Sequence, residues 1–427
     1  MPLTSHCNAA CVFCSHRFNP PGVEIHHLPP RPLDEVVASL DWLAGAEKII
    51  IGESVTRINE GEPLTHPDLV PILEAIGNRL PGRRVRLTTN GSLLDARTAS
   101  IMARLGVELV ISLNSANPRV RSQIMGDTNA AAGLEAVELA ARLGITFEGS
   151  LVALPELVGY DDVAETVLFL AGRGASCIRV MEPGFTRLTP AALVPRPGTR
   201  RRLEQLVAQL RANTGIPVIL EPPHPRDLRA VVEGVVSGSP AQSAGIQAGD
   251  LVETIDGSKP FSRVDAFARL VKSRDPKVTV KGKSGQFTLA KSPGQPAGMV
   301  LCWDLAVGDV AGIAESVVGA RQPLVITSRL GGRILRLGLA RAGIAAGVRP
   351  VPSSFFGGSI ACAGLLTTGD VVAHFREHPP PPGTDLLLLP PRAFDPWNRD
   401  LTGRSYREIE RETGILCVIP RPNQEQE

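Results

Sequence analysis

Three cysteines lie close together near the start of the chain, at Cys7, Cys11 and Cys14. Their spacing allows one loop to wrap around a single metal centre, and thiolates are soft ligands that suit iron–sulfur clusters or zinc. A [4Fe–4S] cluster held by three cysteines leaves one iron with an open coordination position for a substrate or cofactor. The alternatives are a structural zinc site, with His6 or His16 as the fourth ligand, and free thiols.

A series of alternating helical and extended patterns follows, from Leu33 to about Pro222. The expected strands are Lys48–Glu53, Arg84–Asn90, Val107–Leu113, Thr146–Leu154, Cys177–Glu182 and Pro217–Glu221. The expected helices are Asp34–Ala44, Asp68–Asn78, Ala96–Leu105, Ala130–Leu143, Asp161–Gly172 and Thr199–Ala212. This alternation predicts a parallel sheet, open or closed into a partial barrel. Active sites on such sheets lie at the carboxyl ends of the strands, so the loops after the strands should carry function.

The stretch from Cys7 to Cys14, CNAACVFC, resembles the signature of the radical S-adenosylmethionine (SAM) superfamily. The resemblance implies an α/β fold with a partial (βα)6-type barrel, and a [4Fe–4S] cluster ligated by Cys7, Cys11 and Cys14. It also implies SAM as a cofactor and an external one-electron donor of the flavodoxin or ferredoxin type. In the family, the open iron chelates SAM, and one electron cleaves the sulfonium to a 5′-deoxyadenosyl radical that removes hydrogen from the substrate.

Three further segments resemble parts of the family that bind SAM. Glu60-Gly61-Glu62-Pro63 is similar to the Gly-Gly-Glu-Pro loop that holds the SAM amino group, with Glu60 in place of the first glycine. Thr89-Asn90-Gly91 and Ser112-Leu113-Asn114-Ser115 end the next two strands. The resemblance thus implies cofactor-binding roles for Glu60, Gly61, Glu62, Pro63, Asn90, Ser112 and Asn114. Each segment alone also fits a turn or a helix cap, because Asn, Ser and Gly favour strand ends.

The beginning of the chain and its composition set further limits. Only Met1–His6 precede Cys7, so the first strand of the family's barrel should be clipped to about Pro2–Thr4. No secretory signal and no spanning apolar stretch of about 18 residues is visible, so no membrane contact is expected. Seven cysteines, three of them clustered, indicate a metal site in a reducing cytoplasm. A net charge of +2 does not indicate a nucleic-acid partner.

The region from 223 to 305 has a different pattern of predicted elements, with short strands around one helix at Arg263–Lys272. Six of the seven lysines lie between Lys259 and Lys291. The stretch from Ser237 to Gly257, SGSPAQSAGIQAGDLVETIDG, resembles a PDZ domain, a module that adds a peptide as an extra strand and holds its terminal carboxylate. The segment Asp227-Leu228-Arg229-Ala230 does not match the usual Gly-Leu-Gly-Phe loop. The domain is therefore expected to brace its neighbours, with a peptide or protein partner as the other possibility.

Residues 306–427 return to an αβ pattern, with strands expected near Leu324–Thr327, Ser359–Ala361 and Asp385–Leu389. Their glycine-rich segments resemble an uncharacterised domain that accompanies PDZ and radical SAM segments in bacterial proteins. The chain should thus have three domains, a radical SAM partial barrel (1–222), a PDZ-like domain (223–305) and a C-terminal α/β domain (306–427).

Two functional hypotheses follow from these features. The first is a radical SAM enzyme, of oxidoreductase or transferase type, that cleaves SAM reductively and abstracts hydrogen from its substrate. The alternative is a non-catalytic or electron-transfer iron–sulfur scaffold that binds a peptide or protein partner through its PDZ and C-terminal domains.

Overall fold

The computed structural model describes residues 1–53 and 57–421, and this part of the chain forms two compact units. The first unit contains Met1–Phe18, Ile25–Gly184 and Thr189–Pro222. The second contains Asn19–Glu24, Phe185–Leu188 and the chain from Pro223 onward. The PDZ region and the C-terminal region thus belong to one compact unit, and their separation into two domains stays a prediction.

The first unit is built on six parallel strands in the order β2-β4-β5-β6-β7-β8. The strands are β2 (Lys48–Ile51), β4 (Arg84–Thr89), β5 (Glu108–Ser112), β6 (Phe147–Val152), β7 (Ile178–Met181) and β8 (Val218–Glu221). Each lies within an expected extended segment. The parallel sheet of a partial barrel is therefore confirmed.

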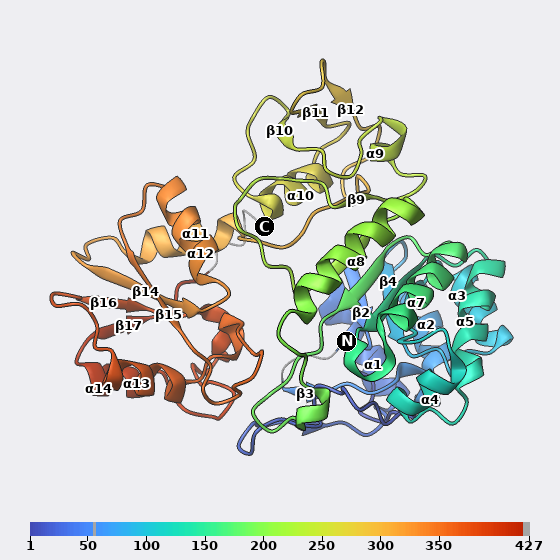
Figure 1. Cartoon of the computed structure of the whole chain (residues 1–427), viewed down its shortest axis with the longest axis horizontal. Coiled ribbons are helices and arrows are strands. Elements are labelled where there is room, and N and C mark those ends of the chain that lie inside the picture. The colour runs from blue at the N-terminus through green and yellow to red at the C-terminus, as the bar shows by residue number, and fades with distance from the viewer. Residues whose placement is uncertain (54–56, 422–427) are drawn as a thin grey trace. The chain divides into compact units, whose positions relative to one another are not determined.

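Helices cover one face of this sheet (Figure 1). They are α1 (Leu33–Ser39), α2 (Leu69–Arg79), α3 (Ala96–Arg104), α5 (Ala130–Arg142), α7 (Tyr160–Gly172) and α8 (Thr199–Thr214). Two shorter helices, α4 (Pro118–Met125) and α6 (Pro155–Val158), instead pack in a small apolar cluster with the cysteine loop. Side chains alternate between the two faces of a strand. Val85 and Leu87 of β4 are accordingly buried in the apolar core, and Arg86 between them points to the opposite face. We call this opposite face of the sheet the polar face.

The residues before Cys7 do not form the short strand expected at Pro2–Thr4. The segment is nevertheless fixed, because Leu3 and Thr4 are buried and the Gly61 amide donates to the Thr4 carbonyl at 2.8 Å. A small parallel pair, β1 (His26–His27) with β3 (Ile58–Asn59), lies in the connections that follow. The start of the chain is thus held by the loop that carries the Glu60–Pro63 motif.

The PDZ region is a small β domain with one longer helix, as expected, and its strands pair in an antiparallel arrangement. Its elements are β9 (Gly234–Val235), α9 (Pro240–Ser243), β10 (Val252–Ile255), α10 (Arg263–Lys272), β11 (Lys277–Val280), β12 (Phe287–Thr288) and β13 (Met299–Val300). Ala241, Ile246 and Leu270 belong to its apolar core. Leu228 and Phe261 instead pack with Leu305 into the core of the C-terminal sheet. The PDZ region therefore shares part of the apolar core of its C-terminal neighbour, and a bracing role between both αβ regions stays a prediction.

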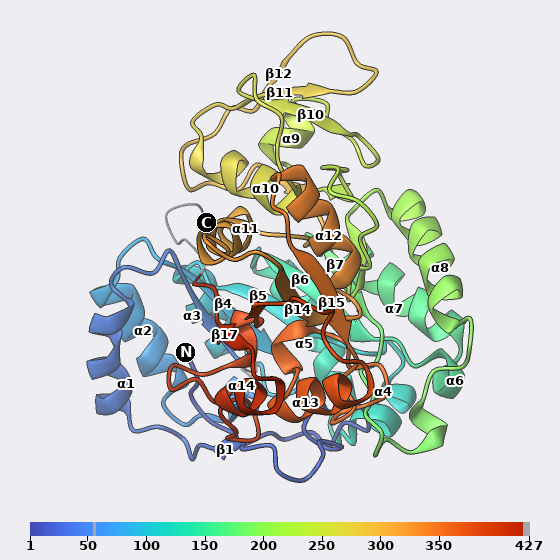
Figure 2. The same cartoon turned by 90° about the vertical axis from the view of Figure 1, so that its left-hand side faces the viewer.

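The C-terminal region contains a second parallel sheet in the order β15-β14-β16-β17. Its strands are β14 (Pro323–Ser328), β15 (Gly347–Val351), β16 (Leu386–Leu388) and β17 (Leu416–Val418). Helices α11 (Val307–Ser316) and α12 (Gly332–Arg341) lie on one face, and α13 (Thr368–Glu377) and α14 (Arg407–Thr413) lie on the other (Figure 2).

The prediction of a strand at Ser359–Ala361 is wrong, because this segment is a turn followed by irregular chain. Gly357 and Gly358 both have positive φ, 64° and 60°, which bends the backbone there. The Ser359 amide then donates to the Phe185 carbonyl at 2.9 Å. The glycine-rich stretch therefore forms a tight turn.

In the described part of the chain, no helix combines the length and the apolar character that crossing a membrane requires.

Candidate functional site

The cysteine loop is held by the end of α4. The Ala10 amide donates to the Met125 carbonyl at 2.8 Å, and the Val12 amide donates to the Ile124 carbonyl at 2.9 Å. Cys11 packs in a small apolar cluster around Ile124 and Met125. The backbone on both sides of Cys11 is thus anchored to the end of α4.

All three cysteines are free thiols, with Cys7 and Cys14 exposed and Cys11 half-buried. Burial raises the pKa of Cys7, and it raises the pKa of Cys11 to about 12, so the thiols are neutral until a metal displaces their protons. A set of three thiolates on one loop matches the donor chemistry of an iron–sulfur cluster, in which each thiolate ligates a different iron. The residues present therefore fit a three-cysteine cluster.

A single zinc ion needs ligands that converge on one point. Within residues 1–53 and 57–421, no group of three or more His, Cys, Asp and Glu side chains is arranged in that way. His16, one of the two candidate fourth ligands, has both ring nitrogens buried without a hydrogen-bond partner in the described chain. Burial lowers the pKa of His16, with a further contribution from His27.

The Glu60–Pro63 loop packs against the residue that precedes Cys7. The Glu62 amide donates to the His6 carbonyl at 2.7 Å, and a Cβ atom at Gly61 would lie only 1.9 Å from the same oxygen. A side chain at position 61 is therefore excluded. The close backbone approach that the family motif provides is present at Gly61, although Glu60 replaces the glycine before it.

The Glu62 carboxylate is buried and held by three donors. It accepts from Thr89 Oγ1 at 2.6 Å, from the Asn90 amide at 2.7 Å and from the Leu64 amide at 3.2 Å. Burial raises the pKa of Glu62, while these hydrogen bonds oppose that rise. Two of the donors come from the end of β4, so the strand end fixes the carboxylate in one orientation.

Asn90 connects this carboxylate to the cysteine loop. Its side-chain amide donates to Asn8 Oδ1 at 2.8 Å, and Asn8 lies directly after Cys7. The structure thus places Glu62, Asn90 and the cysteine loop side by side. Sequence spacing alone did not indicate the contribution of Asn8.

Ser112 and Asn114 lie at the end of β5. Ser112 Oγ is 3.0 Å from Ser150 Oγ on β6, within hydrogen-bond distance. Asn114 has a positive φ of 64°, its Oδ1 accepts from the Val152 amide at 2.9 Å, and its Nδ2 donates to the Ser112 carbonyl at 3.1 Å. The Asn114 side chain therefore ties the ends of two strands together, and the Ser112 hydroxyl faces the polar side of the sheet.

Arg121 on α4 is a central residue of this edge that sequence reasoning missed. It is completely buried, and it donates to the carbonyls of Asn90, at 2.7 Å, and Leu113, as well as to Asp127. Burial lowers the pKa of Arg121, whereas the Ser92 and Arg121 hydrogen bonds keep the pKa of Asp127 below its ordinary value despite burial. The helix that holds the cysteine loop is thereby pinned to the ends of β4 and β5.

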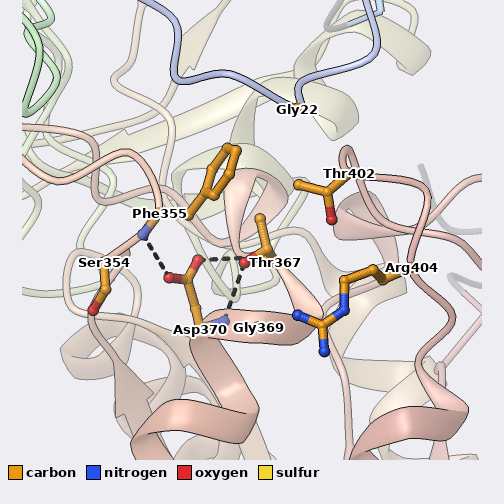
Figure 3. Close-up of a pocket in the computed structure, with 8 residues that line it drawn as sticks. All are labelled: Gly22, Ser354, Phe355, Thr367, Gly369, Asp370, Thr402 and Arg404. Carbon is orange, nitrogen blue, oxygen red and sulfur yellow. Dashed lines mark hydrogen bonds between the residues drawn. The ribbon is translucent and has the colours of Figure 1, made fainter.

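The second unit contains a separate cavity of about 470 Å³, lined by Gly22 and by residues around α13 and α14 (Figure 3). Asp370 in its wall accepts from the amides of Phe355 and Thr367 at 2.8 and 3.0 Å and forms a capping box at the start of α13. Arg404 donates to Glu408 through Nε at 2.9 Å. Asp370 is therefore a structural capping residue here.

The segment Asp227–Ala230 stands where PDZ domains usually have a Gly-Leu-Gly-Phe loop, and the side chain of Asp227 forms hydrogen bonds within and next to it. Asp227 accepts from the Arg229 amide at 3.0 Å and from Arg263 Nη2 at 2.8 Å. Arg263 also contacts the buried carboxylate of Asp304 at 3.2 Å. The carboxylate of Asp227 thus already accepts from donors of this segment and of α10.

Comparison with known proteins adds to this geometry. Residues 1–170 match the family model of the radical SAM superfamily, and residues 231–281 match that of the PDZ domain. GTP 3′,8-cyclase from Aquifex aeolicus is 29% identical over 166 residues, which cover 38% of this chain and 48% of that protein. The corresponding enzyme from Picosynechococcus is 33% identical over 186 residues, covering 40% and 46%. The chain spans about half the length of the curated relatives it matches.

Among solved structures, SuiB from Streptococcus suis bound to its precursor peptide SuiA is similar with a TM-score of 0.42. The two chains are 18% identical, and the similarity covers 52% of this chain and 48% of SuiB. The match to the radical SAM superfamily implies a [4Fe–4S] cluster and SAM as cofactors. The chain therefore contains a radical SAM superfamily domain, over residues 1–170, and a PDZ domain, over residues 231–281.

Proposed function

We propose that this protein is a radical SAM enzyme that cleaves SAM reductively and removes a hydrogen atom from its substrate. One observation carries the proposal. The cysteine loop is joined, through the Asn8–Asn90 hydrogen bond and the Glu62–His6 backbone contact, to the buried carboxylate of Glu62, which accepts from the end of β4. A rigid connection between metal ligands and a group suited to an ammonium is what the chemistry requires.

In this proposal Cys7, Cys11 and Cys14 hold the cluster, which supplies the electron that cleaves SAM. Glu62 is held in one orientation by its three donors, and its Oε2 accepts one of them, so a lone pair on that oxygen can receive the SAM ammonium. Charge-assisted hydrogen bonds of this kind are short and directional.

The other residues of the edge shape the remainder of the site. Gly61 allows the close backbone approach beside His6, and Pro63 begins the short 3₁₀ turn Pro63–Thr65. Ser112 offers its hydroxyl on the polar face. Asn90 and Asn114 position the loops through their own hydrogen bonds, and Glu60 stands where the family has a glycine.

Anaerobic reconstitution with iron and sulfide, followed by dithionite and SAM, tests the proposal. We expect 5′-deoxyadenosine well above the level of a control in which Cys7, Cys11 and Cys14 are all replaced by Ala. A normal cluster spectrum without 5′-deoxyadenosine would refute the enzyme and favour the iron–sulfur scaffold. Anaerobically purified protein with zinc and no sulfide would refute both.

The partners form a second part of the proposal. A PDZ domain suggests a peptide partner. Reduction of the cluster requires an external one-electron donor, for which we propose a flavodoxin or a ferredoxin. Thiol ligands of this kind persist in a reducing compartment, which supports a cytoplasmic location.

A further inference from the structure

The cavity of the second unit lies where a parallel α/β sheet usually holds a ligand. In the C-terminal sheet, the chain after β14 leads to α12 on one face, whereas the chain after the neighbouring strand β16 leads to α14 on the other face. Ligands of open parallel sheets bind outside the carboxyl ends of the strands, where this direction changes. The segments that follow β15 and β16 and the start of α13 form most of the cavity wall, and all of them lie at that edge.

The wall of the cavity combines an aromatic ring with polar groups. Figure 3 shows Phe355 on one side, Thr402 and Arg404 on the other, and the first turn of α13 between them. The volume of about 470 Å³ is within the usual range for small-molecule sites. Such sites hold a ligand through apolar contact and a few placed hydrogen bonds.

Three hydrogen-bond donors in this wall have no partner in the described part of the chain. They are the Gly369 amide, the Ser354 hydroxyl and Arg404 Nη1. Arg404 contacts Glu408 only through Nε and Nη2, and its side chain is 44% exposed, so solvent satisfies Nη1 until a ligand displaces it. A Cβ atom at Gly369 would lie 2.8 Å from Arg404 Nη1. The Gly369 amide and Arg404 Nη1 therefore lie side by side at the start of α13.

Two hydroxyls next to the wall also lack a partner within residues 1–53 and 57–421. Ser353 Oγ and Thr368 Oγ1 are buried, and these residues directly precede the lining residues Ser354 and Gly369. Buried polar groups in folded proteins are nearly always hydrogen-bonded, to the protein or to a bound molecule. This edge thus has more hydrogen-bonding capacity than the described chain uses.

The fixed charges around the cavity disfavour a charged ligand. Asp370 in the wall and the buried Asp400 beside Thr402 are carboxylates that accept hydrogen bonds from the chain itself. An anion in the cavity would approach both carboxylates, whereas a cation would approach Arg404 and the positive end of α13. A neutral ligand avoids both kinds of repulsion.

Thr402 supplies an acceptor that complements the free donors. Its hydroxyl donates to Asp400 Oδ1 at 2.7 Å, so Oγ1 can only accept from a ligand. Donors at the start of α13 and an acceptor at Thr402 match a planar ring amide, in which a carbonyl and an N–H group are adjacent. The ring of such a compound can also pack against the aromatic side chain of Phe355.

We infer that this cavity binds a neutral planar heterocycle with a ring amide, as in the nucleobases hypoxanthine, guanine and uracil. The ring carbonyl accepts from the Gly369 amide and Arg404 Nη1. The ring N–H donates to Thr402 Oγ1, and the ring packs against Phe355. The site consists of residues of the second unit only, so it goes beyond the proposed function and its binding can be measured without a cluster.

Inosine is a suitable probe, because its base is neutral and carries one ring amide, and purine riboside is a matched control that lacks the carbonyl and the ring N–H. Binding to the full chain is measured by calorimetry, with the wild type, Arg404→Met and Arg376→Met. Arg376 forms an exposed ion pair with Glu412 outside the cavity wall, so its replacement matches the loss of a guanidinium. We expect inosine to bind the wild type and Arg376→Met equally, and Arg404→Met about tenfold more weakly. Purine riboside should bind the wild type at least about tenfold more weakly than inosine does.

Gly369→Ala is a second variant of the wall, and it keeps every charge. Its Cβ atom would displace Arg404 Nη1 from the start of α13, so this variant should also bind inosine more weakly than the wild type. Urea unfolding of each variant shows that the protein measured is folded.

Four results would overturn the inference. The first three are the absence of inosine binding to the wild type up to millimolar concentration, equal binding of inosine and purine riboside, and unchanged inosine affinity in both variants of the wall. Inorganic phosphate serves as the anionic probe on the same protein. Tighter binding of phosphate than of inosine would assign the cavity to an anion and refute a neutral ligand.

Discussion

Gly133 on α5 lies directly against the guanidinium of Arg121, and a Cβ atom at Gly133 would be 2.4 Å from Arg121 Cζ. The guanidinium has no room to move, because it is completely buried and bonded to the carbonyls of Asn90 and Leu113 and to Asp127. Because Gly133 has no side chain, α5 leaves space for Arg121. Arg121 in turn connects α4, the helix that contacts the cysteine loop, to the ends of β4 and β5.

Replacement of Gly133 by Ala should destabilise the protein by about 1–3 kcal/mol, because overpacking a rigid site forces side chains from their positions. The measurement is the free energy of unfolding in urea. Gly172 provides a matched control, since it is also a helical glycine but has no atom within 4 Å of its Cβ position. Gly172→Ala should leave stability unchanged or slightly increased. Equal stability of the two variants would show that Arg121 is not fixed.

Arg121 and Asp127 should behave as a coupled buried pair. The side chains are 0% and 2% exposed, and their ion-pair distance is 3.1 Å. Arg121→Met leaves an unpaired buried carboxylate, which costs about 3–5 kcal/mol. The double variant Arg121→Met/Asp127→Asn removes that charge, so it should be more stable than the sum of the single changes predicts. Urea unfolding of the four proteins gives the coupling energy, and strict additivity would contradict the pairing.

The sequence pattern revealed the strands of the first sheet but missed α4, and the reason is physical. Hydrophobic periodicity treats arginine as a solvent-facing residue, whereas Arg121 is the buried anchor of this helix. Strand β15 was missed because Pro350 argues against a strand. Pro350 is tolerated there because β15 is an edge of the sheet, where a missing amide breaks fewer ladder hydrogen bonds.

Residue types at strand ends could be predicted as candidates, but their partners depend on contacts between distant segments. Glu62 and Asn90 were selected from their motifs, and the structure adds that the Asn90 amide donates to Glu62. The roles of Asn8 and Ser150 come only from the fold, because each acts through a residue on another strand or loop. Local sequence carries no signal for pairings of this kind.

Glu62→Gln should weaken SAM binding. The substitution removes the charge that attracts the SAM ammonium and presents an amide donor to the Thr89 hydroxyl or the Asn90 amide, which are donors themselves. Loss of one charge-assisted hydrogen bond corresponds to roughly a tenfold to hundredfold weaker affinity. The change in the electron paramagnetic resonance spectrum of the reduced cluster on SAM titration measures it. Glu74→Gln, an exposed carboxylate paired with Arg104 on α3, should match the wild type. Unaltered SAM affinity in Glu62→Gln would remove Glu62 from the site.

Glu60 should make stability depend on pH near neutrality. Burial, with repulsion from Glu53 as a smaller cause, raises the pKa of Glu60 from 4.5 to about 6. Its Oε1 is buried without a hydrogen-bond partner in the described residues. Because the folded protein holds the Glu60 proton more tightly than the unfolded chain, the protonated carboxyl contributes to the free energy of unfolding. This contribution is complete below pH 4.5 and is lost as the pH rises through about 6. Glu60→Gln should therefore gain stability relative to the wild type above that pH. Melting temperatures of both proteins across this window measure the gain, and a constant difference would contradict it.

Asp227 should prevent the PDZ domain from reading a peptide carboxylate. Although burial opposes it, hydrogen bonds from Arg229 and Arg263 hold the pKa of Asp227 below its ordinary value, so the group is charged and repels a second carboxylate. The wild type should bind a fluorescein-labelled hexapeptide ending in valine no better than its C-terminal amide.

Asp227→Asn removes this charge and leaves Arg263 with Asp304 as its remaining carboxylate partner. Fluorescence anisotropy should then show that the free-carboxylate peptide binds about tenfold more tightly than the amidated peptide. The amidated peptide is the internal control, because its affinity should change little between the two proteins. A wild-type preference for the free carboxylate would mean that the terminus binds elsewhere than at the Arg229 amide, and the interpretation of Asp227 as an occupant of the loop would be wrong.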